Sequence, residues 1–279
     1  MSAVIKPTLP SLDSDYSLTQ EQIQQYQRDG HILLRGVLSP EEVAAYRAVI
    51  NEGVARLNWE TRALDKRDTY GKAFLQIGNL SERAGEDAAR FTLARRFAKI
   101  AADLMDAGGV RLYHDQALYK EVGGGHTPWH QDHHYWPLDT DQTITMWMPL
   151  VDASTAMGTM RFASGSHREG YLGDLPISDQ SEETFRKFVV ERGYPVVESG
   201  EMAAGDATFH SGWTLHGAPG NLTGPTREVM TVIYFADGAS VSAPVNDAQE
   251  NDRHTALGGL APGELAASAS NPLLYTRGE

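Results

Sequence analysis

Residues 205–217 read Gly-Asp-Ala-Thr-Phe-His-Ser-Gly-Trp-Thr-Leu-His-Gly and predict two short strands, each with a His at its end. Similar short segments, rich in β-branched and aromatic residues, flank this stretch and are separated by Gly, Pro and Asp turns. They span residues 110–121, 143–151, 158–163, 195–202 and 227–236. Regularly spaced short strands of this kind are typical of sandwiches and barrels, and here they predict a mainly β core of the jelly-roll type.

The residues before this core predict helices. Residues 18–28 and 88–105 have helical periodicity. Ser39-Pro-Glu-Glu42 has the cap, the proline and the glutamate that start a helix, which should run to about Leu57. Two strands are also expected in this part, at 31–37 and 73–78.

The chain as a whole predicts one α+β domain, residues 1–279, because 279 residues of which 41% are hydrophobic can bury a single large core. We expect the β core at about 110–236, supported by N-terminal helices within 18–107. A polar helix is expected at 178–191. The tail at 237–279 is rich in Gly, Ala, Pro and Ser, and we expect it to be coil.

The composition excludes several classes of protein. There are no cysteines, which rules out disulfides, zinc–thiolate sites and thiol nucleophiles and leaves His, Asp and Glu as metal ligands. The formal net charge of −13 argues against nucleic-acid binding, because a phosphate backbone needs a basic face. Since the chain has no apolar run of membrane-spanning length and no signal-like start, we expect a cytoplasmic protein without a membrane partner.

A candidate metal site lies in Thr127-Pro-Trp-His-Gln-Asp-His-His-Tyr-Trp-Pro137. His130 and Asp132 are two residues apart, so on an extended segment their side chains would face the same side. A neutral imidazole and a carboxylate, completed by a second imidazole, form the facial triad of non-haem iron(II) oxygenases, which leaves three coordination positions open. The pattern of residues alone leaves His210 and His216 as alternatives for that second imidazole.

Arg227 opens the apolar segment 229–235 and is a candidate anion-binding residue. A buried guanidinium is costly without an anionic partner. The distal carboxylate of 2-oxoglutarate would supply one, with bidentate geometry that Lys cannot reproduce. An internal salt bridge to an Asp or Glu is the alternative.

At these residues the chain resembles the phytanoyl-CoA dioxygenase family of iron(II)- and 2-oxoglutarate-dependent oxygenases. The resemblance covers roughly residues 20 to 240, and the combined motif is specific. Its pieces are His130-Gln-Asp132 with Tyr135-Trp-Pro137, Thr145-Met-Trp-Met-Pro-Leu-Val-Asp152, Gly158 with Ser164-Gly-Ser-His167, Leu215-His-Gly217 with Arg227 eleven residues after His216, and the opening 26–42.

The resemblance implies a double-stranded β-helix, a cupin-like jelly roll, with helices packed on one side. It implies that His130, Asp132 and His216 bind iron(II) and that Arg227 binds the far end of 2-oxoglutarate. Trp147 matches a family tryptophan that borders the co-substrate, and Lys72 lies where some members place a lysine on it. One departure is Ala218, where some members have a serine that contacts the co-substrate.

The implied activity is a dioxygenase reaction with Fe(II), 2-oxoglutarate and O2 that hydroxylates a small molecule and releases succinate and CO2. The retained Asp132 favours oxygen insertion over halogenation, because related halogenases replace this carboxylate with a small residue. Desaturation, epimerisation or ring formation at the same iron site remains open, and so does a metal-binding jelly roll without oxygenase activity. We expect a monomer or a homodimer.

Several further residues are candidates for the surroundings of the metal. The N-terminal arm 1–16 and the insertion 167–191 are candidate lids. Side chains that could line a substrate pocket, or equally pack the barrel, are Gln76, Trp129, His133, His134, Tyr135, Trp136 and Trp213.

Overall fold

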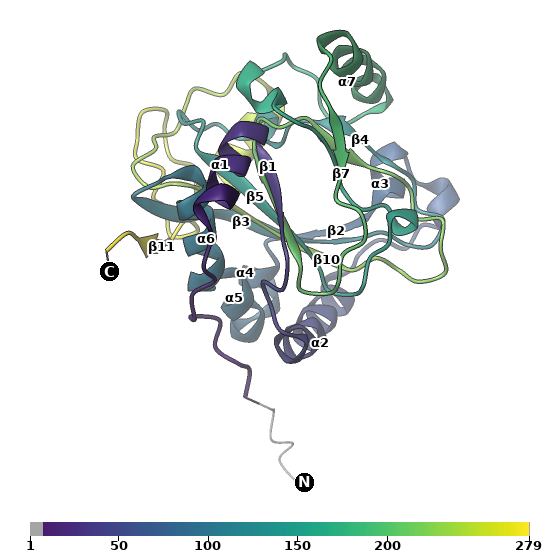
Figure 1. Ribbon diagram of the computed structural model, residues 1–279, viewed down its shortest axis with the longest axis horizontal. Coiled ribbons are helices and arrows are strands. Elements are labelled where there is room, and N and C mark those ends of the chain that lie inside the picture. Colours follow the sequence, from purple (N-terminus) through teal and green to yellow (C-terminus); the bar gives the residue numbers. More distant parts are fainter. Residues whose placement is uncertain (1–7, 279) are drawn as a thin grey trace.

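Two antiparallel sheets form the core of the computed structural model, which describes residues 8–278 (Figure 1). Part of the predicted arm, residues 1–7, lies outside the described residues. In the larger sheet the strand order is β1 (His31–Leu34), β8 (Ala207–Ser211), β5 (Thr143–Pro149), β10 (Val229–Ala236), β3 (Gly109–Tyr119) and β11 (Leu273–Thr276), and β2 (Leu75–Gly78) also pairs with β3. The smaller sheet has the order β4 (Thr127–His130), β9 (His216–Ala218), β6 (Arg161–Ala163) and β7 (Val196–Glu198).

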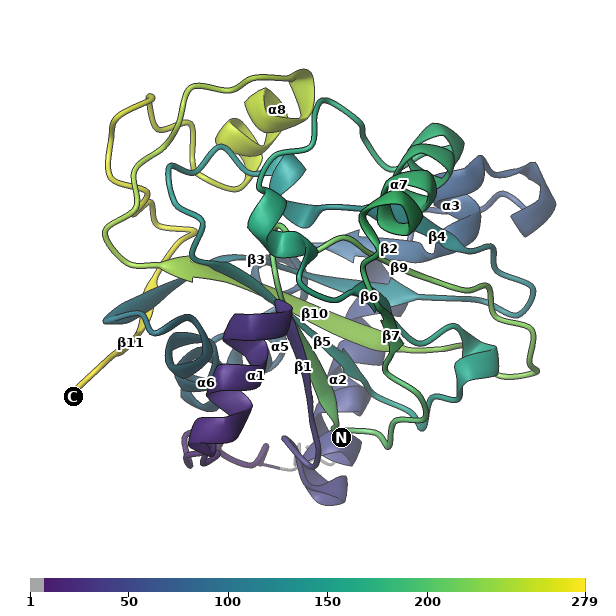
Figure 2. The same cartoon turned by 45° about the horizontal axis from the view of Figure 1, so that its top comes forward.

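Helices cover the outer face of the larger sheet, and the other helices lie elsewhere (Figure 2). The covering helices are α1 (Gln20–Asp29), α2 (Pro40–Leu57), α4 (Leu80–Ala84), α5 (Glu86–Thr92) and α6 (Arg95–Met105). Helix α7 (Asp179–Arg192) packs on β4, and α8 (Asp247–Thr255) packs on the short 3-10 helix η2 (Asp132–Tyr135). The remaining short elements are η1 (Leu64–Lys66), α3 (Thr69–Ala73), η3 (Thr155–Met157) and η4 (Ser166–Glu169).

The predicted start of α2 is confirmed. The Ser39 hydroxyl accepts a hydrogen bond from the Glu42 N–H (3.2 Å), and the Glu42 carboxylate accepts one from the Ser39 N–H (2.8 Å). Glu42 also forms an ion pair with Arg96 of α6 (2.8 Å). The same carboxylate therefore caps one helix and fixes a second helix against it.

Alternating side chains on the central strands separate a hydrophobic core from a cavity. On β10, Met230, Val232 and Tyr234 belong to the main hydrophobic core, which the helices cover. Thr231 and Ile233 point the other way and line the cavity between the sheets. Strand β5 follows the same rule. This period of two is why fully buried strands can carry both packing and functional side chains.

A β-bulge interrupts this alternation on β3. Ile233 pairs with His114 and Tyr234 pairs with Leu112, so Tyr113 is an extra residue in the ladder. Leu112 faces the main core, whereas Tyr113 packs beside Ile233 and His114 lines the cavity. The bulge thus brings two consecutive side chains to the cavity side of the sheet.

Two sequence predictions about elements are wrong. The helix expected over 88–105 is two helices, because Ala94 has extended backbone angles and α6 turns away to pack on the sheet. The tail 237–279 is not only coil. Asn246 caps α8 through the Gln249 N–H (2.8 Å), and β11 adds to the edge of β3. The abundance of Gly, Ala, Pro and Ser concealed both elements.

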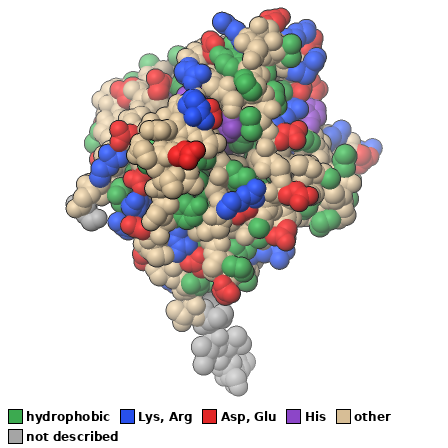
Figure 3. Space-filling view, in the orientation of Figure 1, with side chains coloured by type: hydrophobic (Ala, Val, Ile, Leu, Met, Phe, Trp, Pro, Cys, Tyr) green, Lys and Arg blue, Asp and Glu red, His purple; other side chains and the backbone are tan. Residues whose placement is uncertain are grey.

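The surface and the helices add two observations. Acidic and basic side chains are interspersed over the face shown in Figure 3. Among residues 8–278, none of the helices combines the length and the apolar character needed to cross a bilayer.

Asp115 offers a test of how the helices are attached to the sheet. This buried carboxylate of β3 accepts hydrogen bonds from the Ser81 N–H (3.0 Å) and hydroxyl (3.1 Å) and from the Thr92 hydroxyl (2.7 Å). Asp115→Ala would leave these buried donors unpaired, so we expect the free energy of unfolding to fall by about 2–4 kcal/mol in urea denaturation. The exposed control Asp65→Ala should change it by less than about 0.5 kcal/mol. Equal effects of the two substitutions would contradict this account.

Candidate active site

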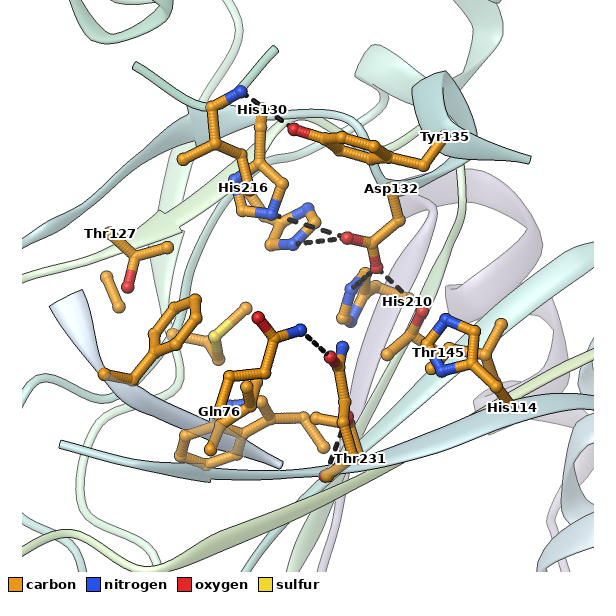
Figure 4. A pocket seen from close by; sticks show the side chains of 18 of the residues that line it. Gln76, His114, Thr127, His130, Asp132, Tyr135, Thr145, His210, His216 and Thr231 are labelled. Atoms are coloured by element: carbon orange, nitrogen blue, oxygen red, sulfur yellow. Dashed lines mark hydrogen bonds and ion pairs between the residues drawn. The ribbon is translucent and has the colours of Figure 1, made fainter. Parts of the chain in front are cut away.

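A cavity of about 300 Å³ lies between the two sheets (Figure 4). Both sheets, the segment after β4 and helix α8 contribute to its walls. Its lining includes Gln76, His114, Gln116, Thr127, His130, Asp132, Tyr135, Trp136, Thr145, Trp147, His210, His216, Arg227, Thr231, Ile233 and Asp252. Polar and apolar side chains together line a space large enough for small-molecule ligands.

Three potential metal ligands converge at one side of this cavity. The ligand atoms of His130, Asp132 and His216 all lie within 4.8 Å of one another. His130 and His216 are cross-strand partners on β4 and β9. Asp132 is the first residue of η2 rather than part of an extended strand, yet its Oδ1 lies 3.4 Å from His130 Nε2 and 3.6 Å from His216 Nε2.

Hydrogen bonds orient both imidazoles for metal binding. His130 Nδ1 lies 2.7 Å from the Pro128 carbonyl, and His216 Nδ1 lies 2.9 Å from the Thr214 carbonyl. A carbonyl can only accept, so each Nδ1 carries the proton and each Nε2 keeps a free lone pair toward Asp132. Such a backbone partner for the distal nitrogen is typical of metal-ligating histidines.

The charges of the cluster also suit a divalent cation. Burial alone would raise the pKa of Asp132, but His216, His130 and His210 hold this pKa well below its usual range. Burial and the neighbouring imidazoles His130 and His210 lower the pKa of His216 well below its usual range. At neutral pH the site thus presents the carboxylate of Asp132 and the neutral imidazole of His216, ligand forms that iron(II) requires.

His210 is a further imidazole of the cluster, and it contacts the other oxygen of Asp132. His210 Nε2 lies 3.1 Å from Asp132 Oδ2, and the Thr145 hydroxyl donates to the same oxygen (2.7 Å). Asp132 Oδ1 is left facing His130 and His216. The geometry therefore gives His210 the position of a residue that orients the ligand carboxylate.

Arg227 is fully buried, and burial lowers the pKa of its guanidinium to about 9. The guanidinium stacks over Trp147, 5.0 Å from the ring centroid, and donates to the Gly158 carbonyl. Its Nε–H has no partner among the described residues. None of the ion pairs found in residues 8–278 involves Arg227, so the alternative of an internal salt bridge receives no support.

A second buried basic side chain, Lys120, lies beside Arg227 and was missed by sequence reasoning. Burial and, secondarily, the charge of Arg227 lower the pKa of Lys120 to about 6. Its ammonium donates to the Gly125 carbonyl (2.5 Å) and to the Thr127 hydroxyl (3.3 Å), and Thr127 lines the cavity. The signal was available: His114, Gln116 and Leu118 line the cavity at every second position, and Lys120 continues the series.

The sequence model of one protein family, described as Phytanoyl-CoA dioxygenase (PhyH), matches residues 26–229. The chain belongs to this family. An ectoine dioxygenase of Bordetella parapertussis is 24% identical over 262 residues, which cover 86% of this chain and 82% of that protein. The predicted family is therefore confirmed.

Solved structures show the same architecture. The α-ketoglutarate-dependent carbocyclase SnoK from nogalamycin biosynthesis has a TM-score of 0.75 at 25% identity, over 92% of this chain and 96% of that one. The epimerase SnoN, in complex with Fe3+, α-ketoglutarate and nogalamycin RO, has a TM-score of 0.76 at 25% identity, over 92% and 98%. Together with the family and the ectoine dioxygenase relative, these neighbours confirm the predicted jelly-roll fold, the dioxygenase class and the prediction of iron, 2-oxoglutarate and O2 as cofactors.

Within this family fold, the other predicted residues fall into two groups. Trp147, Gln76, Tyr135 and Trp136 line the cavity. Lys72 lies half-buried in the last turn of α3 and is not among the residues that line the cavity, so its contact with 2-oxoglutarate stays a prediction. The remaining aromatic and His candidates pack outside the cavity lining: His133 stacks on Trp213, Trp129 lies under Arg161, and His134 is near Asp174.

Metal binding can be measured as a change in the unfolding temperature of the protein. Anaerobic Fe(II) should raise the unfolding temperature of the wild type, because an ion that binds the native state stabilises it. His216→Ala removes one ligand, and we expect it to lose most of this Fe(II)-induced shift. His254→Ala, which alters an exposed histidine of α8, should keep it. An undiminished shift in His216→Ala would refute the assignment of this ligand.

Proposed function

We propose that this chain uses His130, Asp132 and His216 to hold iron(II) and Arg227 to bind 2-oxoglutarate, and that it hydroxylates an unactivated C–H bond of a small molecule. The observation that carries the proposal is the arrangement of one cavity. A two-His, one-carboxylate ligand set lies on one side, and a buried guanidinium without a carboxylate partner among the described residues is aimed into the same space.

The chemistry of the residues fits both absent groups. Iron(II) with 2-oxoglutarate and O2 supplies an oxidative decarboxylation that yields succinate and CO2 and oxidises a C–H bond. Arg227 and Lys120 fit the far carboxylate of 2-oxoglutarate, since an anionic ligand would offset the buried charge of Arg227 and favour the protonated form of Lys120. Trp147 would hold the guanidinium in place through its ring face.

Other residues would orient the reactants and keep water out. The Thr145 hydroxyl and His210 fix one oxygen of Asp132. The Tyr135 hydroxyl accepts a hydrogen bond from the Ile177 N–H (2.9 Å), and this contact ties the segment before α7 to the cavity wall. Glu182 of α7 accepts from the Trp129 N–H (2.9 Å), so α7 is attached next to the ligand strand β4. These contacts make the 167–191 insertion the best candidate for a lid.

A second outcome, ring formation or epimerisation, is favoured by the carbocyclase SnoK and the epimerase SnoN among the structural neighbours. All of these outcomes begin with the same oxidation of a C–H bond and differ in the subsequent step. A product mass increased by one oxygen would decide for hydroxylation, whereas an unchanged mass would indicate epimerisation and a loss of two hydrogens ring formation or desaturation.

Succinate formation tests the oxygenase proposal itself. We expect Asp132→Ala to lower the rate of 2-oxoglutarate-dependent succinate formation at least about a hundredfold, because an essential ligand carboxylate is lost. Asp247→Ala, at an exposed position of α8, is the matched control and should keep the wild-type rate. Wild-type protein that forms no succinate with Fe(II) and 2-oxoglutarate would favour the metal-binding protein without oxygenase activity.

Proton uptake tests the role of Lys120. With its pKa near 6, Lys120 is largely neutral at pH 7.5 in the free protein. A carboxylate bound beside it would raise this pKa, so we expect uptake of about one proton per 2-oxoglutarate at pH 7.5 and weaker binding as the pH rises. Calorimetric titration of the Zn2+-loaded protein in buffers of different ionisation enthalpy measures this uptake.

Lys120→Met supplies the control for that titration. The variant should bind 2-oxoglutarate with little or no proton uptake, because the remaining cation, Arg227, is already protonated at pH 7.5. If wild type and variant took up the same number of protons, Lys120 would not be the group that responds to the co-substrate.

A further inference from the structure

Asp252 is an acidic side chain of the cavity wall that the metal and co-substrate sites do not use. It comes from α8, in the tail that the sequence predicted to be coil, and its carboxylate lines the cavity. The hydroxyl of Tyr113, the extra residue of the β3 bulge, donates to its Oδ2 (3.0 Å). The bulge and the tail helix together therefore present a carboxylate to the ligand space.

Asp252 lies at the end of the cavity opposite Arg227. Arg227, which precedes β10, lies on the same face of the chain as Thr231 and Ile233 of this strand. Ile233 pairs with His114, next to the bulge. An extended chain advances about 3.3 Å per residue, so the Ile233 end lies on the order of 20 Å from Arg227 along the backbone. A co-substrate held at Arg227 would therefore leave the Asp252 end for the substrate.

The charges of the cavity are unequal at its two ends. Three lining side chains carry a formal charge at neutral pH: Asp132, Arg227 and Asp252. Asp132 would be matched by iron(II) and Arg227 by 2-oxoglutarate. No Lys or Arg among the described residues forms an ion pair with Asp252, and burial raises its pKa to about 6, which leaves it ionised at pH 7.5. The negative charge of Asp252 therefore has no cationic partner among the described residues, and a substrate could supply one.

Aromatic rings accompany this carboxylate. Tyr70, Tyr135 and Trp136 line the same cavity, and the negative charge of Asp252 contributes, after burial and Asp132, to raising the pKa of Tyr135 to about 12. His114 offers an imidazole whose Nδ1 has no partner among the described residues, and burial lowers its pKa to about 4. A carboxylate beside electron-rich ring faces and a neutral imidazole favours a cation over an anion.

We propose that Asp252 is a substrate-recognition residue and that the substrate carries a basic nitrogen. This nitrogen is an amine that is protonated at neutral pH, and its ammonium group lies against the Asp252 carboxylate. This inference rests on the proposed function, because it assigns the substrate end of the same cavity. The ammonium would pair with Asp252 while the C–H bond to be oxidised faces His130, Asp132 and His216. Anionic substrates are disfavoured by the same carboxylate.

The test is a panel of matched small molecules in which an alicyclic amine or amino sugar is compared with the analogue that carries a hydroxyl in place of the nitrogen. The readout is succinate formation above the substrate-free rate, with wild type, Asp252→Asn and the control Asp247→Asn. We expect amines to stimulate the wild type at least tenfold more than their hydroxyl partners. In Asp252→Asn, kcat/KM for the amines should fall at least tenfold and the preference over hydroxyl analogues should vanish, whereas Asp247→Asn should retain both.

Three outcomes overturn the inference: stimulation mainly by neutral or acidic compounds, equal amine preference in Asp252→Asn and wild type, or no stimulation by any amine of the panel. Substrate-free succinate formation separates this failure from failure of the proposed function. If it occurs without amine preference, only the role of Asp252 is wrong, and if it is absent, the oxygenase proposal itself fails. Because Asn can still accept the Tyr113 hydrogen bond, Asp252→Asn should fold, and its unfolding temperature checks this. The amine preference of the wild type tests the inference even if the variant does not fold.

Discussion

The carboxylate of Asp132 is the point on which the arrangement of the cavity depends. It is a largely buried negative charge, with 20% of the side chain exposed, and such a charge is tolerated when hydrogen bonds and polar partners surround it. Its two oxygens are divided between different partners, with His130 and His216 on one and Thr145 and His210 on the other. These partners come from both sheets. A single side chain therefore fixes the distance between the sheets at the place where the chemistry is expected.

The two ends of the cavity, on either side of that carboxylate, differ in charge. Arg227 carries a buried positive charge at one end, and Lys120 beside it gains a second one when an anion binds there. Asp252 adds negative charge at the other end, with the ligand cluster on one wall between them. A protein that needed only stability would replace such groups by apolar ones, since unpaired buried charges oppose folding. Their presence indicates that ligands complete the charge balance and that the interior is organised for bound molecules.

The strands of the core were predictable because short segments rich in β-branched and aromatic residues lie between Gly, Pro and Asp turns, as at β5 and β10. Local signals also sufficed for the start of α2, where Ser39 and Glu42 form the expected capping box. What failed depended on tertiary contacts. The turn at Ala94 is set by the packing of α6 on the sheet, and β11 exists only because β3 offers an unpaired edge. Neither contact has a local sequence signature.

The candidate site was predictable to a similar degree. His130, Asp132 and Arg227 carried chemistry that a single sequence can show, and the family resemblance chose His216 over His210. All four side chains line the same cavity. The parity of Lys120, one residue beyond β3, marks it as a cavity-side residue, whereas the family resemblance implied Lys72 instead. Asp252 could not have been found, because nothing in a polar tail helix reveals that it packs on η2.

The bulge at Tyr113 divides β3 into two stretches of opposite parity. Beyond it, Gln116, Leu118 and Lys120 keep a strict in-and-out order beside the cationic end, while Tyr113 and His114 both turn inward at the other end. A substitution, insertion or deletion in one stretch therefore need not change which side chains of the other stretch face the cavity. A constant reaction and a variable choice of substrate can thus share one strand, which gives this architecture a simple route to diversify without rebuilding its chemistry.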